Sequence, residues 1–158
     1  MSAGSRDVNE PDKPFQFLFR VRYAECDAQD VVFNARYADY VDLAATEFLR
    51  AAGLDYRELL ESGLDNQVVR LELQWRAPAR FDDILCAEVW LAAVGRTSYT
   101  LHTRFRLHDS GDLVASAEAV YVMVTRADWR KTPVPEWLSD KLAHGALGRV
   151  TDQSGHQN

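Results

Sequence analysis

Residues that would point to a metal or disulfide protein are scarce in this sequence. Its 158 residues include two cysteines, Cys26 and Cys86, and four histidines, and neither type occurs at metal-site spacing. We therefore expect reduced thiols, no bound metal and a cytoplasmic location.

Long apolar runs and an excess of basic residues are also missing. No segment approaches the about 18 apolar residues that a membrane span needs, and the N-terminal residues lack the apolar run of a signal peptide. The 18 Lys and Arg residues are outnumbered by 24 Asp and Glu residues, which gives a formal net charge of −6. Because nucleic-acid-binding proteins usually carry a positive balance, that class of function is disfavoured.

What remains is the composition of one globular domain. Apolar residues make up 47% of the chain and charged residues 27%, which is typical of folded proteins, and the length supports one core rather than two. Residues 1–13 and 145–158 are polar, and we expect them to form flexible tails. The folded domain is therefore assigned to residues 14–144.

Hydrophobic periodicity predicts one long helix among several strands. The aromatic and β-branched content of residues 15–23 favours a strand. From Asn34 apolar residues recur at helical spacing up to Gly53, which predicts a helix of about 35–52 with Asn34 as its N-cap. A short helix follows at about 56–62. Alternating residues then predict strands at 67–76, 84–93, 98–108 and 113–125, before a last short helix at about 136–143.

These elements define an α+β fold. Short turns join the four later strands, so we expect an antiparallel meander with one apolar face to cover. The alanine-rich helix is the only long element available to cover it. We therefore predict a curved antiparallel sheet of about five strands wrapped around one central helix. Because one helix leaves part of the sheet exposed, we also expect a second copy of the chain.

Asp27 and Asn34 form the candidate site. The predicted strand ends near Asp27, and the helix begins near Asn34 after a short loop, so a carboxylate and a helix N-terminus face the same small volume. A carboxylate can activate water or attack a carbonyl directly, and the free N–H groups of the helix can stabilise the oxyanion. The simpler alternative is that Asp27 makes a turn and Asn34 caps the helix.

Residues 24–50, AECDAQDVVFNARYADYVDLAATEFLR, carry a resemblance to a known family. Together with 77–83, 95–98 and 131–133 they resemble the hotdog-fold thioesterases. The most similar branch is 4-hydroxybenzoyl-CoA thioesterase-like and includes the short acyl-CoA thioesterases linked to the Tol–Pal system. The resemblance covers about residues 15–140.

The resemblance implies hydrolysis of an acyl-CoA thioester to a carboxylic acid and CoA. Asp27 would be the nucleophile or general base, and the backbone N–H at Asn34 would polarise the thioester carbonyl. The family forms hotdog homodimers or tetramers with the active site between subunits, and no cofactor is implied beyond the CoA of the substrate. Two departures stand out: Gln29 and Asp30 follow where glycine is frequent, and Asn34 replaces a frequent histidine.

Substrate-binding residues follow from the same motifs. Val32, Phe33 and Tyr37 lie next to the implied oxyanion donor, although the place of Tyr37 on the apolar stripe also fits core packing. The phosphates of CoA require a local basic cluster in this acidic chain. The candidates are Arg96 with Thr97 and Ser98 in one turn, and Arg126 and Lys131 after the last strand; each also fits a solvated surface charge.

Other activities remain open at this point. An acyl-carrier-protein thioester would undergo the same chemistry, and a non-catalytic acyl-CoA-binding module would explain the departures at Gln29, Asp30 and Asn34. Cys26 is a less favoured nucleophile because no histidine lies nearby in the sequence. Glu47, on the helix, is expected to face solvent or to pair with Arg50.

Overall fold

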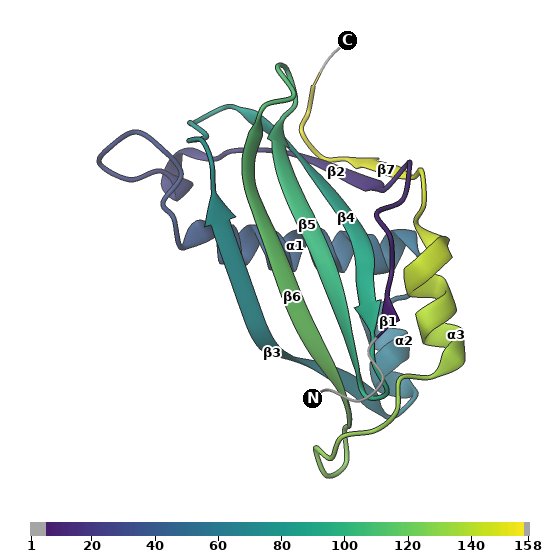
Figure 1. Cartoon of the computed structure of the whole chain (residues 1–158). Coiled ribbons are helices and arrows are strands. Elements are labelled where there is room, and N and C mark those ends of the chain that lie inside the picture. The colour runs from purple at the N-terminus through teal and green to yellow at the C-terminus, as the bar shows by residue number, and fades with distance from the viewer. Residues whose placement is uncertain (1–5, 157–158) are drawn as a thin grey trace.

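One sheet curves around one central helix. The computed structural model describes residues 6–156 and shows helix α1 lying across the concave face of the sheet (Figure 1). The strands are β1 (Arg6–Asp7), β2 (Phe15–Arg20), β3 (Leu64–Trp75), β4 (Ile84–Val94), β5 (Ser98–Leu107), β6 (Leu113–Thr125) and β7 (Val150–Asp152). The helices are a 3₁₀ turn (Tyr23–Glu25), α1 (Arg36–Ala51), α2 (Tyr56–Glu61) and α3 (Glu136–Asp140), which continues as a π-helical turn (Lys141–Gly145).

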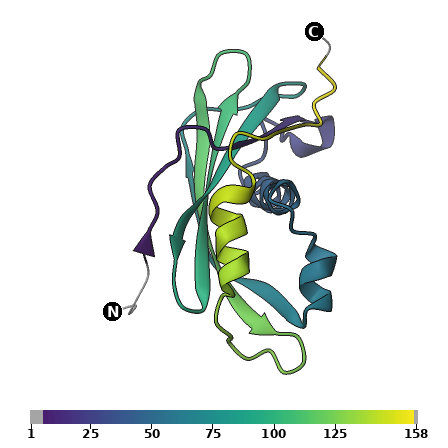
Figure 2. The same cartoon turned by 90° about the vertical axis from the view of Figure 1, so that its right-hand side faces the viewer.

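The helices all lie on one side of the sheet. Figure 2 looks along α1 and shows α2 and α3 beside it, with the large strands together on the other side. The predicted α+β architecture is therefore confirmed. Within residues 6–156 no helix has both the length and the apolar character that crossing a membrane requires.

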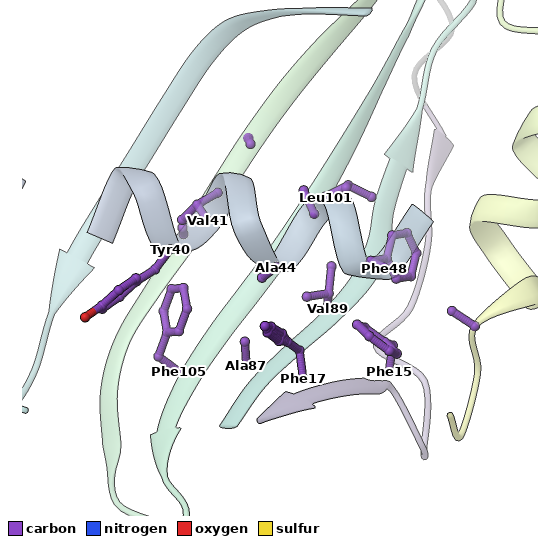
Figure 3. Close-up of a cluster of buried hydrophobic side chains, with 14 of the residues drawn as sticks. Phe15, Phe17, Tyr40, Val41, Ala44, Phe48, Ala87, Val89, Leu101 and Phe105 are labelled. Carbon is purple, nitrogen blue, oxygen red and sulfur yellow. The ribbon is translucent and has the colours of Figure 1, made fainter. Parts of the chain in front are cut away.

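The apolar stripe of α1 is the reason for its position. Tyr37, Val41, Ala44 and Phe48 recur at helical spacing and are buried, so one side of the helix packs against the sheet. Figure 3 shows four α1 residues, Tyr40, Val41, Ala44 and Phe48, facing side chains of β2, β4 and β5. The sheet residues labelled there are Phe15, Phe17, Ala87, Val89, Leu101 and Phe105.

The two ends of α1 differ in how well the sequence predicts them. Gly53 has a φ of +83°, which confirms its predicted role as the residue that ends the helix. Asn34 is not the predicted N-cap, because Ala35 holds that position and no side chain makes a capping bond. Instead a backbone turn starts the helix: the Arg36 N–H donates to the Phe33 carbonyl at 2.9 Å.

The order of the strands differs from a simple meander. The sheet order is β3-β6-β5-β4-β2-β7, with β1 pairing β4. The β4–β5–β6 meander is confirmed, but β3 pairs with β6 instead of β4. The physical reason is that β2 occupies the second edge of β4, which leaves the free edge of β6 for β3.

Both ends of the chain contribute strands. Residues 6–7 pair with Val94 and Ala93 of β4, and β7 runs parallel to β2, in ranges where the sequence predicts flexible tails. The Arg20 Nε also donates to the Ser154 carbonyl at 2.9 Å. These short polar strands satisfy backbone groups at the edges of β2 and β4. Residues 1–5 and 157–158 of the predicted tails lie outside the described residues.

A substitution at Gly145 tests the packing between the C-terminal segment and α1. A Cβ at this position would lie 2.6 Å from the Ala52 carbonyl oxygen and 2.9 Å from the Ala52 Cα. Because both contacts are backbone atoms, Gly145→Ala should lower the free energy of unfolding by about 1–3 kcal/mol in urea denaturation. The neighbouring exposed change His144→Ala should alter it by less than about 0.5 kcal/mol. Equal stability of both variants would contradict this packing.

Glu88 lies at the centre of an ion-pair network on the sheet. Its Oε1 accepts from the Nε atoms of Arg104 and Arg106, both at 2.9 Å, and the Glu88 side chain is only 12% exposed. Burial by itself would raise the pKa of Glu88, but the two guanidinium groups outweigh it and the pKa is lowered. Glu88 therefore stabilises the fold above the ordinary glutamate pKa, and this contribution is lost as the pH falls through the lowered value.

Glu88→Gln should lower the free energy of unfolding by about 1–3 kcal/mol at pH 7, because two guanidinium groups lose their charged acceptor. The difference from the wild type should shrink as the pH is lowered below the ordinary glutamate pKa and through the lowered pKa of Glu88. Urea denaturation at several pH values measures it. The matched control is Glu72→Gln, since Glu72 pairs with Arg70 on the exposed surface and should change stability by less than about 1 kcal/mol. A Glu88 variant as stable as this control would show that the Glu88 ion-pair network does not stabilise the fold.

Candidate functional site

A short closed loop carries Asp27. The antiparallel bridge between Cys26 and Val32 joins the two sides of the loop. Within it the Asp27 N–H donates to the Val31 carbonyl at 2.9 Å, and the Asp30 N–H donates to the Asp27 carbonyl at 3.0 Å. Asp30 has a φ of +61°, a conformation that glycine prefers and aspartate tolerates. This explains how an aspartate fits a loop that often contains glycine.

The Asp27 side chain is held by one of its two oxygens. Oδ1 accepts from the Gln29 N–H at 2.8 Å, which forms an Asx turn and confirms that Asp27 shapes the loop. Within residues 6–156, Oδ2 has no hydrogen-bond donor, and the side chain is only partly buried. One oxygen therefore fixes the orientation of the carboxylate while the other is available to a ligand or a water molecule.

The backbone that leads from the Asp27 loop into α1 presents unused donors. The Val32 N–H donates to the Ala79 carbonyl at 2.8 Å, and the Phe33 N–H donates to the Glu25 carbonyl at 2.9 Å. The N–H groups of Asn34 and Ala35, both exposed, have no acceptor in the part of the chain that the structure describes. Since α1 has 16 residues, its dipole adds positive potential at this end. The arrangement can bind a carbonyl oxygen that gains negative charge.

The residues predicted to contact the acyl group divide into two kinds. Val32 and Tyr37 are buried in the core, whereas Phe33 is half-exposed. Burial raises the pKa of Tyr37 to about 12, so its hydroxyl stays protonated at neutral pH. Within this group, Phe33 is therefore the side chain that the structure leaves accessible.

Cys26 is poorly suited to be a nucleophile. Partial burial raises the pKa of its thiol, and the nearby carboxylates of Glu25 and Asp27 raise it further. Because the thiolate is the reactive form, these carboxylates keep Cys26 unreactive. Glu47 is buried and pairs with Arg50, so its predicted partner is confirmed, but not the solvent-facing alternative.

The predicted phosphate-binding residues gather at one end of the sheet. The Val134 N–H donates to the Arg96 carbonyl at 2.8 Å, which places the segment after Lys131 against the β4–β5 turn. Thr97 and Ser98 lie in the same turn and are partly buried, whereas Arg96, Arg126 and Lys131 are exposed. The structure therefore brings Arg96 to the same end of the sheet as Arg126 and Lys131, although it lies 30 positions before Arg126 in the sequence.

This basic end and the Asp27 loop lie at opposite ends of β3. The Arg126 N–H donates to the carbonyl of Gly63, the residue before β3 begins, at 3.0 Å. At the other end, the Val32–Ala79 hydrogen bond ties the Asp27 loop to the segment that follows Trp75 (Figure 1). Sequence patterns did not reveal this separation within one protomer.

Two cavities flank α1. One of about 450 Å³ lies between the 3₁₀ turn, α1 and the segment after β3, where the Tyr40 hydroxyl donates to Glu25 Oε1 at 2.9 Å. The other, of about 520 Å³, lies between α1 and the start of β3. Its polar lining, which sequence analysis missed, includes Asp42, Thr46, Asn66 and Gln67. The i, i+4 spacing of Asp42 and Thr46 on the polar side of α1 is the one signal the sequence offered.

Strand β3 has one open edge. Among residues 6–156 its only strand partner is β6. Four large apolar side chains of this 12-residue strand are exposed. They are Val68, Val69, Leu71 and Trp75. A long apolar edge of this kind is a template for pairing with another chain.

Three comparisons with known proteins agree with this architecture. A model of the thioesterase-like superfamily matches residues 21–142. The acyl-CoA thioester hydrolase YbgC of Escherichia coli is 27% identical over 122 residues, which cover 77% of this chain and 90% of YbgC. The 1,4-dihydroxy-2-naphthoyl-CoA hydrolase of Synechococcus elongatus is 25% identical over 130 residues, covering 81% and 94% of the two chains.

A solved structure gives the same result. The crystal structure of protein TT1821 from Thermus thermophilus is 30% identical and has a TM-score of 0.74, with 81% of this chain and 96% of that chain covered. The family resemblance drawn from residues 24–50 is thereby confirmed. With its central helix, its curved sheet and a family match over most of its length, the chain belongs to the thioesterase-like superfamily and has the hotdog fold.

Proposed function

We propose that this protein is an acyl-CoA thioesterase that converts an acyl-CoA and water into a carboxylic acid and CoA. One observation carries the proposal: in the described part of the chain, one carboxylate oxygen of Asp27 has no donor, and the backbone leading from the Asp27 loop into α1 leaves the N–H groups of Asn34 and Ala35 without an acceptor. The names of the E. coli and S. elongatus relatives, both CoA thioester hydrolases, support the same reaction. An acyl-carrier-protein thioester is the alternative substrate.

Each group has a role in the proposed reaction. The thioester carbonyl oxygen would accept hydrogen bonds from the Asn34 and Ala35 N–H groups, which stabilise the oxyanion as it forms. Asp27 would either remove a proton from the attacking water or attack the carbonyl carbon itself. A C–O bond to the carbonyl carbon forms first, and the C–S bond breaks when the tetrahedral intermediate collapses and releases the CoA thiolate. If Asp27 is the base, the proton that it takes from water passes to the thiolate or to solvent. If Asp27 is the nucleophile, water then hydrolyses the acyl-aspartyl anhydride and restores the carboxylate. Because a thiol has a pKa of about 8.5, the thiolate leaves without a strong general acid.

The replacement of a frequent histidine by Asn34 does not weaken this scheme. The backbone N–H provides the hydrogen bond, so the side chain does not need to exchange a proton as a histidine could. Since Asn34 does not cap α1, its amide is also free to orient a water molecule. The loop keeps its shape because Asp30 adopts the conformation that glycine would otherwise provide.

A homodimer paired through β3 completes the proposed site. Antiparallel pairing of two β3 edges about a two-fold axis places the Leu64 end of one strand beside the Trp75 end of the other. The hydrogen bond between Arg126 and Gly63 lies at the first end, and the Asp27 loop is tied to the second. The cations of one protomer would therefore approach the Asp27 loop of its partner.

Asp27→Asn tests the catalytic assignment. The change is nearly isosteric and keeps an acceptor for the Gln29 N–H, so the loop should fold normally. Turnover should fall by at least about 10²-fold because the amide can neither accept a proton nor attack. A thiol-release assay on a panel of aliphatic and aromatic acyl-CoAs measures it.

The matched control for this experiment is Asp30→Asn, since asparagine also tolerates a positive φ and Asp30 lies in the same loop. This variant should keep most of its activity. Full turnover by the Asp27 variant would exclude Asp27 as the catalytic carboxylate. No thiol release by the wild type from any acyl-CoA would redirect the proposal to carrier-protein thioesters or to a binding role.

Leu71→Lys tests the proposed interface. A lysine on an edge strand opposes strand pairing, so this exposed position should tolerate the change in a monomer but not in a β3–β3 dimer. Analytical ultracentrifugation at micromolar concentration should show a dimer for the wild type and a monomer for the variant. Activity should fall at least about tenfold, because each Asp27 site would lose the phosphate-binding cations that the partner protomer supplies.

Val150→Lys is the control, because Val150 is exposed on β7 at the opposite edge of the sheet. It should leave both the sedimentation behaviour and the activity unchanged. A Leu71 variant that stays dimeric and active would rule out pairing through β3.

A further inference from the structure

An exposed tryptophan stands at the tip of a short hairpin after β6. Residues 124–131, here called the Trp129 hairpin, are closed by a bridge between Val124 and Lys131. The Trp129 N–H donates to the Thr125 carbonyl at 2.8 Å, and the Thr125 N–H donates to the Arg130 carbonyl at 2.9 Å. The Trp129 side chain is nonetheless 59% exposed. The hairpin therefore fixes the backbone of this residue without burying its ring.

The conformation of Trp129 is costly. Its φ is +57°, a region that bulky side chains avoid at a cost of about 1–2 kcal/mol. Asp128 helps to maintain the turn by accepting from the Thr125 hydroxyl and pairing with Arg130 at 3.5 Å. A glycine or asparagine would relieve the strain, so the structure gives no packing reason for a tryptophan at the tip.

The hairpin is also locally basic. Arg126, Arg130 and Lys131 lie on it with a single carboxylate, that of Asp128. Arg96 joins this end through the hydrogen bond from the Val134 N–H to its carbonyl. The group thus holds four cations and one anion, a net charge of +3, in a chain of net charge −6. In the described part of the chain, Arg96, Arg126 and Lys131 have no acidic partner within 4.0 Å.

We propose that Trp129 is a stacking platform for the adenine base of CoA, with Arg126, Arg130 and Lys131 binding its phosphates. An aromatic ring fixed in solvent stacks on a nucleobase, and adjacent cations neutralise phosphate groups. This inference rests on the proposed thioesterase function and specifies its substrate. A CoA thioester carries this nucleotide, whereas an acyl-carrier-protein thioester presents a protein-bound phosphopantetheine arm that lacks it.

The alternative occupant of this surface is an acidic carrier protein. Cations alone would suit either partner, because both are negatively charged. The exposed ring decides between them: the flat face of an indole matches a base, and the backbone hydrogen bonds of the hairpin hold Trp129 at the tip, where it is 59% exposed. The observations therefore favour a nucleotide, and a carrier protein becomes an outcome of the test.

Binding can be tested without hydrolysis. Calorimetric titrations with CoA and with adenosine 3′,5′-bisphosphate should show that Trp129→Ala weakens both by about 5- to 100-fold, the range for loss of one base stack. Trp129→Phe should recover part of the affinity. The control is Trp137→Ala, which removes another exposed tryptophan and should leave both affinities unchanged. Equal affinity of the wild type and a folded Trp129→Ala variant would overturn the proposal.

Kinetics provide a second test. For one acyl group carried on CoA, Trp129→Ala should raise KM by about 5- to 100-fold and leave kcat unchanged. For the same group carried on pantetheine alone, the variant should match the wild type. A loss confined to carrier-protein thioesters would overturn the proposal in favour of protein docking. The titrations do not require turnover, so a failure of the thioesterase assignment would be seen separately.

Discussion

The packing of α1 into the concave face of the sheet is the contact on which the rest of the structure depends. Its apolar stripe, including Val41, Ala44 and Phe48, is buried against β2, β4 and β5, and burial of this kind is the main favourable term in folding. The alanines bring the helix close to the sheet. The direction of α1 follows from this contact, and with it the position of its N-terminus, where the N–H groups of Asn34 and Ala35 have no acceptor among residues 6–156.

The sequence predicts the elements of this fold well because each has its own period. The stripe of α1 and the alternation in β4, β5 and β6 are local patterns that need no knowledge of neighbours. Strand order is different, since alternation tells which face of a strand is buried but not which strand lies beside it. The pairing of β3 with β6 follows from the occupation of β4 by β2. Strands β1 and β7 are too short and polar for periodicity to distinguish them from tails.

The candidate site likewise has features that the sequence predicts and features that it does not. Asp27 and Asn34 could be picked out together from the sequence because only six residues, all in one loop, separate them, so the pairing is local. The way in which α1 begins was not predictable, since the capping role expected of Asn34 is replaced by a backbone turn that depends on Phe33. The clustering of Arg96 with Arg126 and Lys131 depends on where β4, β5 and β6 begin and end. The distance of this cluster from Asp27 follows from the length of β3.

The separation between Asp27 and the cations explains why the open edge of β3 matters for the proposed site. A single protomer holds the carboxylate at one end of a 12-residue strand and the cations at the other, so one substrate cannot use both without a second copy. Antiparallel pairing inverts the strand and converts the separation into proximity. In the proposed dimer each site takes its reacting groups from one protomer and its nucleotide-binding hairpin from the partner. The exposed apolar side chains of β3 and the exposed ring of Trp129 then follow from the same constraint: the proposed dimer would cover the first and the proposed substrate the second.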